Sequence, residues 1–322
     1  MNPEDPPGEL DEIPPEYRQE TSVTEHESVG RRFLDEVLTD RVRLLSLCIV
    51  LGVTLTAVLA PFIAPHDPDQ THELFQPPGS ESVGDFDGDG SEEQAFHLLG
   101  TDSFGHDILS RVIFGARISL LVALSTVALA GVVGTGVGLV AGYFGGWVDN
   151  ALMRYIDFQW AFPEIVLAIA IIAFLGGLGL VNVIIAIGLA FLDDFARIVR
   201  GEVLSIREKE YIKSAKTIGM SDTRIMVREV LPNATAPIIV QATVLFPLAI
   251  LAESALSFLG LGVEPTTPTW GLLISEGRGF ITSHWWIAVM PGIAIMVTVL
   301  SFNVLGDALR DMYDVSNEDI DR

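Results

Sequence analysis

The most regular group of metal-ligand side chains is an acidic run with the spacing of a calcium loop: Asp85, Asp87, Asp89 and Gly90. In such a loop, alternating carboxylates converge on the ion and the glycine makes the turn. The twelfth position should be a glutamate, but it is Phe96, so Glu92 or Glu93 would have to replace it. The run is consistent with a calcium site or with a solvated acidic insertion, and the second interpretation is favoured.

Four histidines flank this run: His66, His72, His97 and His106. Imidazole is a good ligand for nickel and other transition metals. The spacing of these residues matches no compact metal motif, and six histidines in 322 residues is an ordinary number. We therefore predict that they do not form a metal site.

Three further carboxylates border long apolar stretches: Asp193, Asp194 and Glu253. Ionisable groups at such positions usually are hydrated, are paired, or face a cavity or a partner. Arg197 and Arg200 follow the two aspartates by about one helical turn and could pair with them. For the aspartates the alternatives are pairing or a role in gating or ligand contact. For Glu253 they are exposure at the outer membrane interface or contact with a ligand or partner.

Uncharged stretches long enough to cross a membrane as helices occur five times: 44–63, 118–148, 165–192, 233–252 and 285–305. A helix needs about 20 apolar residues to cross a hydrocarbon core of about 30 Å. The composition agrees, because 49% of the residues are hydrophobic although the chain carries 42 Asp and Glu. Charged and apolar residues therefore occupy different segments, and we predict an all-α, multi-pass membrane protein.

The stretch 165–192 is interrupted by Gly176, Gly177 and Gly179, which favour a turn over a helix interior. A helix that began near Asp157 would reach full length at this turn. The stretch is therefore predicted to form a helical hairpin, which raises the expected number of transmembrane helices to six.

The distribution of Lys and Arg supports six spans. Apart from Arg111, Arg117 and Arg278, these residues lie in the first 43 positions, at Arg154, in 197–228 and in the C-terminal tail. Six spans place all of those charges on one face of the membrane, which the positive-inside rule assigns to the cytoplasm. Both termini are then cytoplasmic, and the localisation is the plasma membrane.

The predicted spans divide the chain into five parts: an acidic N-terminal tail (1–43), a first transmembrane helix (44–64), an extracellular acidic loop (65–116), a transmembrane core (117–306) that includes a cytoplasmic loop (197–232), and a C-terminal tail (307–322). The net charge of −23 disfavours nucleic acid as a partner. Its spread over the tails and outer loop is what a halophilic, acidic proteome would show. Cys48 is the single cysteine, so no intrachain disulfide is predicted.

The segment 197–232 has the pattern of two helices separated at Gly219 and Met220. Ser221 would cap the second helix, Asp222 would lie in its first turn and Pro232 would end it. An apolar face follows both helices: Ile212, Ala215, Ile218, Ile225, Met226 and Val230. Because so small a helix pair cannot bury this face alone, we predict that it needs a surface to dock on.

This segment resembles the EAA loop of the membrane subunits of ATP-binding-cassette (ABC) importers, in which E-A-A is followed by glycine and then by I-x-L-P. The matching positions are Lys213, Ser214, Ala215, Gly219, Glu229, Leu231 and Pro232, so the first acidic residue, one alanine and the isoleucine are replaced. Four further segments look like the C-type permease of the dipeptide, oligopeptide and nickel branch: 97–124, 141–171, 196–211 and 253–271. The resemblance covers residues 31–313.

The resemblance implies a permease that works with a second, related permease, two cytoplasmic ATPases and an extracellular solute-binding protein. It implies that the EAA-like segment couples to the ATPases. In such a permease, Glu253, Asp193 and Asp194 are candidates for contact with the pathway or the partner permease, because of their position beside apolar stretches. No phosphate-binding G-x-x-x-x-G-K-[ST] sequence occurs in the chain, so we expect ATP and Mg²⁺ on the partner subunits, and neither enzymatic activity nor a cofactor in this one. Peptides are the expected solutes, with nickel complexes or sugars as alternatives.

Two other classes of protein are less consistent with the sequence. A secondary transporter or channel would show paired repeats with broken helices or a cluster of mid-membrane charges. A membrane enzyme would need a catalytic group of residues at one end of the spans. In the predicted topology, Asp193 and Asp194 lie near the opposite membrane face from Glu253.

Overall fold

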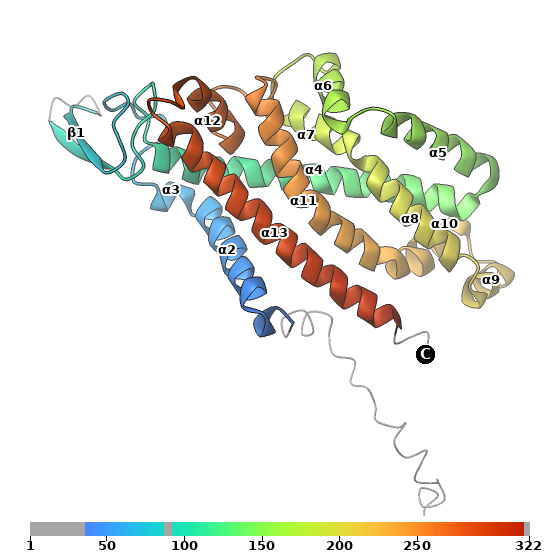
Figure 1. The fold of residues 1–322 in the computed structure, drawn as a ribbon. Helices are drawn as coiled ribbons and strands as arrows, with labels where there is room; N and C mark the ends of the chain where they lie inside the picture. The colour runs from blue at the N-terminus through green and yellow to red at the C-terminus, as the bar shows by residue number, and fades with distance from the viewer. Residues whose placement is uncertain (1–35, 87–91, 319–322) are drawn as a thin grey trace, which may run out of the picture.

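The computed structural model describes residues 36–86 and 92–318, and most of them are helical (Figure 1). The long helices lie side by side, with a small β-hairpin at one end of the molecule and the short helices α9 and α10 at the other (Figure 1). Four helices are long and apolar enough to span a membrane: Arg41–Val58 (α2), Ile108–Phe144 (α4), the continuous helical run Asp222–Phe258 and Trp286–Tyr313. The expectation of several membrane-spanning helices is therefore confirmed.

The predicted glycine turn between 165 and 192 is present. Helix α6 (Glu164–Phe174) ends before it and α7 (Leu180–Ala190) begins after it, and Gly176, Gly177 and Gly179 have φ of 96°, 107° and 144°. Backbone with such positive φ is favourable for glycine alone. The hairpin is less regular than predicted, because α5 (Gly146–Trp160) and α6 are separate helices bent by 98° near Pro163. If this bent pair is one span, the described residues contain up to five.

Helix α7 also does not continue straight into the next helix. It ends at Ala190, and α8 (Leu192–Ile206) begins after Phe191, whose φ of −101° and ψ of 4° depart from helical values. This short break places Asp193 and Asp194 in the first turn of a new helix. Negative charge in a first turn is favoured by the helix dipole.

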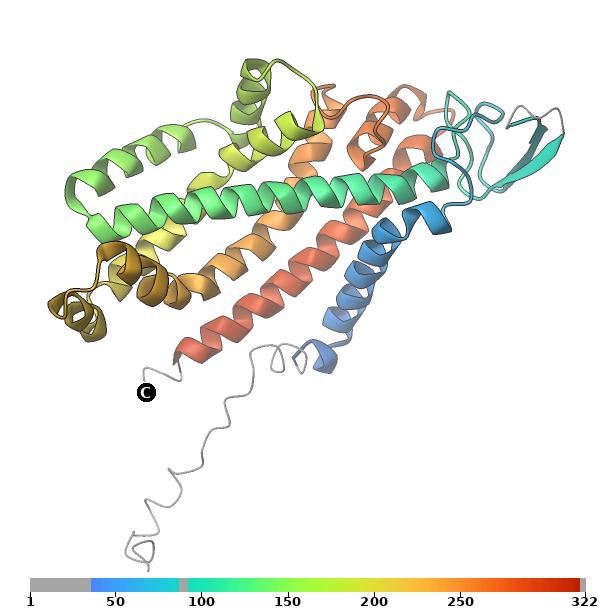
Figure 2. The same cartoon turned by 180° about the vertical axis from the view of Figure 1, so that it is seen from behind.

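Close contact between α4 and α8 requires glycine. A Cβ added at Gly134 would lie 2.4 Å from the Leu192 carbonyl oxygen, and one at Gly138 would lie 2.5 Å from that of Ala196. A Cβ at Gly142 would meet the Cβ of Val203 at 2.8 Å, whereas at Gly136 nothing lies within 4 Å. In the view from behind, α4 runs along almost the whole length of the helical body (Figure 2). The glycines thus let two main chains approach closely along this axis.

The outer loop contains a β-hairpin that the all-α prediction missed. Strands β1 (Ser80–Gly84) and β2 (Glu93–His97) are antiparallel, with Ser80 opposite His97 and Gly84 opposite Glu93. The short helix α3 (Ala60–Ile63) leads into this region from α2. The hairpin escaped prediction because its strands are short and polar, with one buried position in β1 and two in β2.

The remaining helices complete the two ends of the bundle. After α8 come α9 (Glu210–Thr217), α10 (Asp222–Ile225), the π-turn Met226–Val230, a 3₁₀ turn at Pro232–Ala234 and α11 (Thr235–Phe258). After α11 come α12 (Trp270–Gly277), a 3₁₀ turn at Arg278–Phe280 and α13 (Trp286–Glu318). The main apolar core lies between α4, α7, α8, α11 and α12 and includes Phe195, Leu245, Ile250 and Trp270.

Candidate functional site

The apolar face predicted within the loop 197–232 is buried against this chain itself. We call residues 207–234, which carry this face, the 207–234 segment. Ile212, Ile225 and Val230 have no exposed surface, and they pack in one cluster with residues of α4 and α8: Leu139, Tyr143, Val199, Val203 and Ile206. The surface on which this face was predicted to dock is therefore provided by α4 and α8 of the same chain. Ile218 was wrongly included in the buried set, because 78% of its surface is exposed.

Polar contacts fix the same segment to the end of α4. The Tyr143 hydroxyl donates a 2.7 Å hydrogen bond to Asp222, and the Lys216 ammonium lies 4.7 Å from the centre of the Tyr143 ring. Arg207 donates to the Gly142 carbonyl oxygen at 2.8 Å. Tyr143 and Arg207 were not singled out from the sequence, because neither is part of the loop motif. The segment is thus attached to both α4 and α8.

The predicted motif positions divide between an inner and an outer side. Ala215 is buried, whereas Lys213 and Ser214 on the same helix are exposed, and Lys213 pairs with Glu210 at 3.0 Å. Gly219 has φ of 82°, and a Cβ there would meet nothing within 4 Å. The break is therefore conformational and is not caused by crowding.

The second half of the motif departs from the prediction in one detail. Ser221 stands at the N-cap of α10 with extended backbone, but its side chain makes no capping bond. Leu231 is half-buried, and Pro232 opens a 3₁₀ turn before α11. The first helical turns after Ser221 include a π-turn, a feature that often accompanies functional positions in helices.

An exposed surface lies on the side of this segment away from the bundle. It combines apolar and basic side chains: Tyr211, Ile218, Arg224, Val227 and Arg228. Three of these residues, Arg224, Val227 and Arg228, also line an open depression with Ser221 and Thr223. We call these seven residues the outer surface of the 207–234 segment. Seen from behind, α9 projects from the end of the bundle, and α10 lies beside the end of α4 (Figure 2).

The predicted ion pairs of Asp193 and Asp194 are not formed. Arg200 bonds Asp149 of α5 at 2.5 and 2.7 Å, and Arg197 bonds Asp157 of α5 at 3.0 Å. Both arginines thus bond carboxylates of α5, a helix that lies in contact with α8. Hydrogen-bonded pairing thus ties α8 to α5, while Arg197 interacts with Asp193 and Asp194 through its charge.

Asp193 lines a small polar cavity at the breaks between α5 and α6 and between α7 and α8. Its wall also contains Glu164, Gln159 and Trp160. Asp193 is 4% exposed, and Gln159 donates hydrogen bonds to the carbonyl oxygens of Leu189 and Ala190 at the end of α7. Glu164, which sequence reasoning missed, is close enough to both aspartates for their charges to interact. Three carboxyl groups therefore gather where two helices are interrupted.

Glu253 is fully buried, which contradicts one of its two alternatives, exposure at the outer interface. Ser257 donates to its carboxylate at 2.7 Å, and the hydroxyls of Ser119 and Ser254 lie 3.5 Å away. Ser119 in turn accepts a hydrogen bond from the Trp270 backbone N–H at 3.2 Å. The carboxylate is surrounded by hydroxyl groups of α4 and α11 next to the start of α12.

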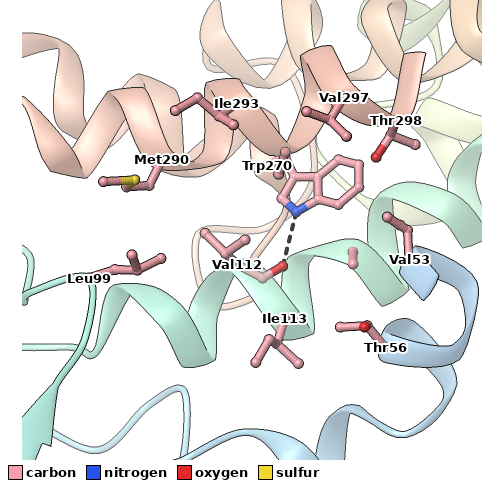
Figure 3. Close-up of a pocket in the computed structure, with 12 residues that line it drawn as sticks. Val53, Thr56, Leu99, Val112, Ile113, Trp270, Met290, Ile293, Val297 and Thr298 are labelled. Carbon is pink, nitrogen blue, oxygen red and sulfur yellow. Dashed lines mark hydrogen bonds between the residues drawn. The ribbon is translucent and has the colours of Figure 1, made fainter. Parts of the chain in front are cut away.

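An apolar cavity of about 320 Å³ lies between α2, α4, α12 and α13 (Figure 3). Its wall is formed largely by aliphatic side chains, and Trp270 lies across it with its indole N–H donating to the Val112 carbonyl oxygen at 3.0 Å. Such a lining has no charged group that could orient a polar ligand.

The outer loop brings together three of the four histidines, although their spacing in the sequence matches no compact metal motif. The ring centres of His66, His72 and His97 lie 4.7 to 5.3 Å from one another. Burial and the neighbouring imidazoles of His97 and His66 lower the pKa of His72 to about 4, so this ring is neutral near pH 7. In the calcium-like run, Asp85 is exposed, and Asp87 and Asp89 lie outside the described residues.

Comparison with known proteins decides the family. Residues 134–315 match the family described as binding-protein-dependent transport system inner membrane component. Residues 28–78 match the N-terminal transmembrane domain of oligopeptide transport permease C. The chain belongs to the binding-protein-dependent permease family. The permease is therefore the membrane component of a transport system.

Curated relatives of the permease cover three quarters or more of its length. It is 41% identical to the dipeptide transport system permease DppC of Alkalihalophilus pseudofirmus over 94% of this chain and 93% of that one. It is 41% identical to the di/tripeptide permease DppC of Pseudomonas aeruginosa over 83% and 86% of the two chains. The glutathione permease GsiD of Pectobacterium atrosepticum is 40% identical over 75% and 80%.

Solved structures extend the likeness to the fold. The permease resembles a chain of the inward-facing MetNI methionine ABC transporter with a TM-score of 0.52 and 18% identity, covering 64% of this chain and 97% of that one. A second crystal form of the same transporter has a TM-score of 0.51 and 20% identity. The fold is therefore that of an ABC transporter membrane subunit.

Proposed function

We propose that the permease forms half of the translocation pathway of an ATP-driven peptide importer, and that its 207–234 segment couples the pathway to cytoplasmic ATPases. A second permease would form the other half, and an extracellular binding protein would deliver the solute. ATP and Mg²⁺ would be bound by the ATPases. The names of the relatives, which refer to dipeptides, di/tripeptides and glutathione, support a small peptide as the solute over nickel complexes or sugars.

The observation that carries the coupling proposal is that the 207–234 segment is buried on one side and exposed on the other. One side is packed without exposed surface onto α4 and α8, and the opposite side exposes Ile218 at 78% and Val227 at 54%. A segment fixed to the bundle in this way moves with it as a rigid body, because packed interfaces do not deform continuously. An ATPase that binds the outer surface would thus move α4 and α8.

The topology that fits this role has six spans with both termini in the cytoplasm. The fifth and sixth spans in addition to the four long helices would be the bent pair α5–α6 and the interrupted pair α7–α8. The grouping of Arg197, Arg200, Arg207 and the basic residues of the outer surface near one end of the bundle supports a cytoplasmic position for that end.

The carboxyl groups of Asp193, Asp194 and Glu164 are proposed to attract the amino group of the peptide within the pathway. Their position at two helix interruptions supports this role, because broken helices in membrane proteins line cavities and ion paths. Glu253 makes its contacts with serines of α4 and α11 and with Thr269, and this supports a role in holding these helices and the start of α12 together.

Solute-stimulated ATP hydrolysis by the assembled transporter tests the coupling proposal. Ile218→Asp places a charge on the outer surface without disturbing the buried side, so stimulation should fall at least about tenfold, the change that about 1.4 kcal/mol of lost contact produces. Ile218→Leu, which keeps an apolar side chain, should retain it. Full stimulation in the Asp variant, with intact assembly, would refute coupling through this surface.

A further inference from the structure

The outer region contains a group of imidazole and carboxyl side chains that the transport proposal does not use. His66 lies just after α3, His72 follows in the same loop, His97 ends β2, and Asp107 caps the N-terminus of α4. Three segments that are separate in the chain therefore meet at one point, close to the hairpin end of the molecule (Figure 1). We call these four residues the outer histidine cluster.

The distances within this cluster suit a transition-metal ion. The ligand atoms of His66, His97 and Asp107 all lie within 4.8 Å of one another. A tetrahedral zinc ion with bonds of about 2.0–2.1 Å holds its ligand atoms about 3.4 Å apart. Side-chain movements that shift each ligand atom by about 1 Å would bring these atoms to bonding distance of one ion.

Hydrogen bonds around the cluster orient its metal-ligand atoms, as the second layer of residues around a metal site does. Asp107 uses one carboxylate oxygen, Oδ2, to accept from the Ser110 N–H and hydroxyl at 2.8 and 2.9 Å, and its Oδ1 lies 2.9 Å from Nδ1 of His97. Nε2 of His66 lies 3.1 Å from the Phe96 carbonyl oxygen, so it can carry the proton, and Nδ1 keeps its lone pair for a metal ion. Nε2 of His97 faces the Ser82 hydroxyl at 2.8 Å, which an ion could displace.

His72 supplies an independent observation. It is 8% exposed, and among the described residues neither of its ring nitrogens has a hydrogen-bond partner. Buried polar atoms without a partner are uncommon and costly, so each requires an explanation. Its ring lies 4.8 Å from that of His66 and 4.7 Å from that of His97. A lone pair on His72 is thus available at the cluster, where a bound cation would satisfy it.

We propose that the outer histidine cluster is a zinc-type metal site, with His66, His97 and Asp107 as ligands and His72 as the fourth. Imidazole and carboxylate donors suit Zn²⁺ and disfavour Mg²⁺, which prefers oxygen ligands alone. The ion enters past His66, the half-buried member of the set. Once bound, it links the loop after α3, the β-hairpin and the start of α4, and so fixes the outer region to the membrane bundle.

Metal analysis of the purified full-length permease tests this proposal. The protein, stripped with a chelator and passed through gel filtration, should rebind one Zn²⁺ per chain, and zinc should raise its melting temperature while Mg²⁺ should not. Loss of one ligand in His66→Ala should weaken zinc binding by at least about 100-fold, because losses of outer-partner residues already cost 10–100-fold. His72→Ala should weaken binding by about tenfold or more.

The control is His106→Asn, which changes an outer histidine that bonds Asp102 and is not a member of the cluster. This variant should bind zinc as the unmodified protein does. His66 is partly exposed, so its replacement should leave the metal-free fold intact, which the melting temperature in chelator verifies. Failure of the unmodified protein to bind stoichiometric zinc, or equal binding by His66→Ala, would overturn the proposal without affecting the importer assignment.

Discussion

Acidic residues next to membrane helices have different surroundings in this permease, and burial alone does not distinguish them. Glu253 is enclosed by hydroxyl groups of its own chain, whereas Asp193 lies on a polar cavity together with Glu164. The sequence singled out both positions by the same rule, an ionisable group beside an apolar stretch. It could not tell them apart, because the serines and the cavity come from distant segments.

This difference leads to a prediction for transport. Asp193→Asn combined with Glu164→Gln should reduce the maximal rate of peptide uptake at saturating binding protein by about tenfold, the effect of losing about 1.4 kcal/mol of charge attraction for the peptide amino group. Glu253→Gln is the matched control, because the carboxylate that it replaces contacts hydroxyl groups of its own chain, those of Ser257 and Thr269 among them, and its uptake rate should stay near normal. Uptake in proteoliposomes measures both. Equal rates for the two variants would contradict a pathway role for Asp193.

At the scale of elements, the sequence predicted those features that depend on local chemistry. The turn at Gly176–Gly179, the break at Gly219 and the long apolar helices each follow from residues that are neighbours in the sequence. The break at Phe191, the hairpin and the histidine cluster do not, because contacts across the fold determine them. The docking of Ile212, Ile225 and Val230 on α8 likewise needed the structure, since periodicity defines an apolar face but not its neighbour.

The glycines of α4 allow a direct test of its packing on α8. Gly138→Ala would place a methyl group 2.5 Å from the Ala196 carbonyl oxygen, so the helices must separate and the melting temperature in detergent should fall. Gly136→Ala, two residues away, meets nothing within 4 Å and should leave the melting temperature unchanged or raise it, since alanine favours helix by about 1 kcal/mol. Similar losses in both variants would show that the close approach does not stabilise the fold.

For the whole molecule, the two ends of the bundle are expected on opposite sides of the membrane. In a Cys48→Ala background, Glu81→Cys in the hairpin should react with a membrane-impermeant maleimide in intact cells. Ser214→Cys in the 207–234 segment should react after the membrane is opened, because six spans place it in the cytoplasm. Both residues are exposed, so burial does not limit the reaction. The six-span topology places an odd number of spans between these two positions. Labelling of Ser214→Cys in intact cells would contradict that topology.

The assembly is the central claim, and affinity purification of the tagged permease in mild detergent tests it most directly. We expect defined partners because the permease belongs to a family of transport-system components and because its 207–234 segment, packed on α4 and α8, exposes a surface of apolar and basic residues. We predict that a second permease of the same family and ATPase subunits with phosphate-binding loops remain bound. A permease that purifies alone, yet moves peptide across liposome membranes without ATP, would contradict the importer account.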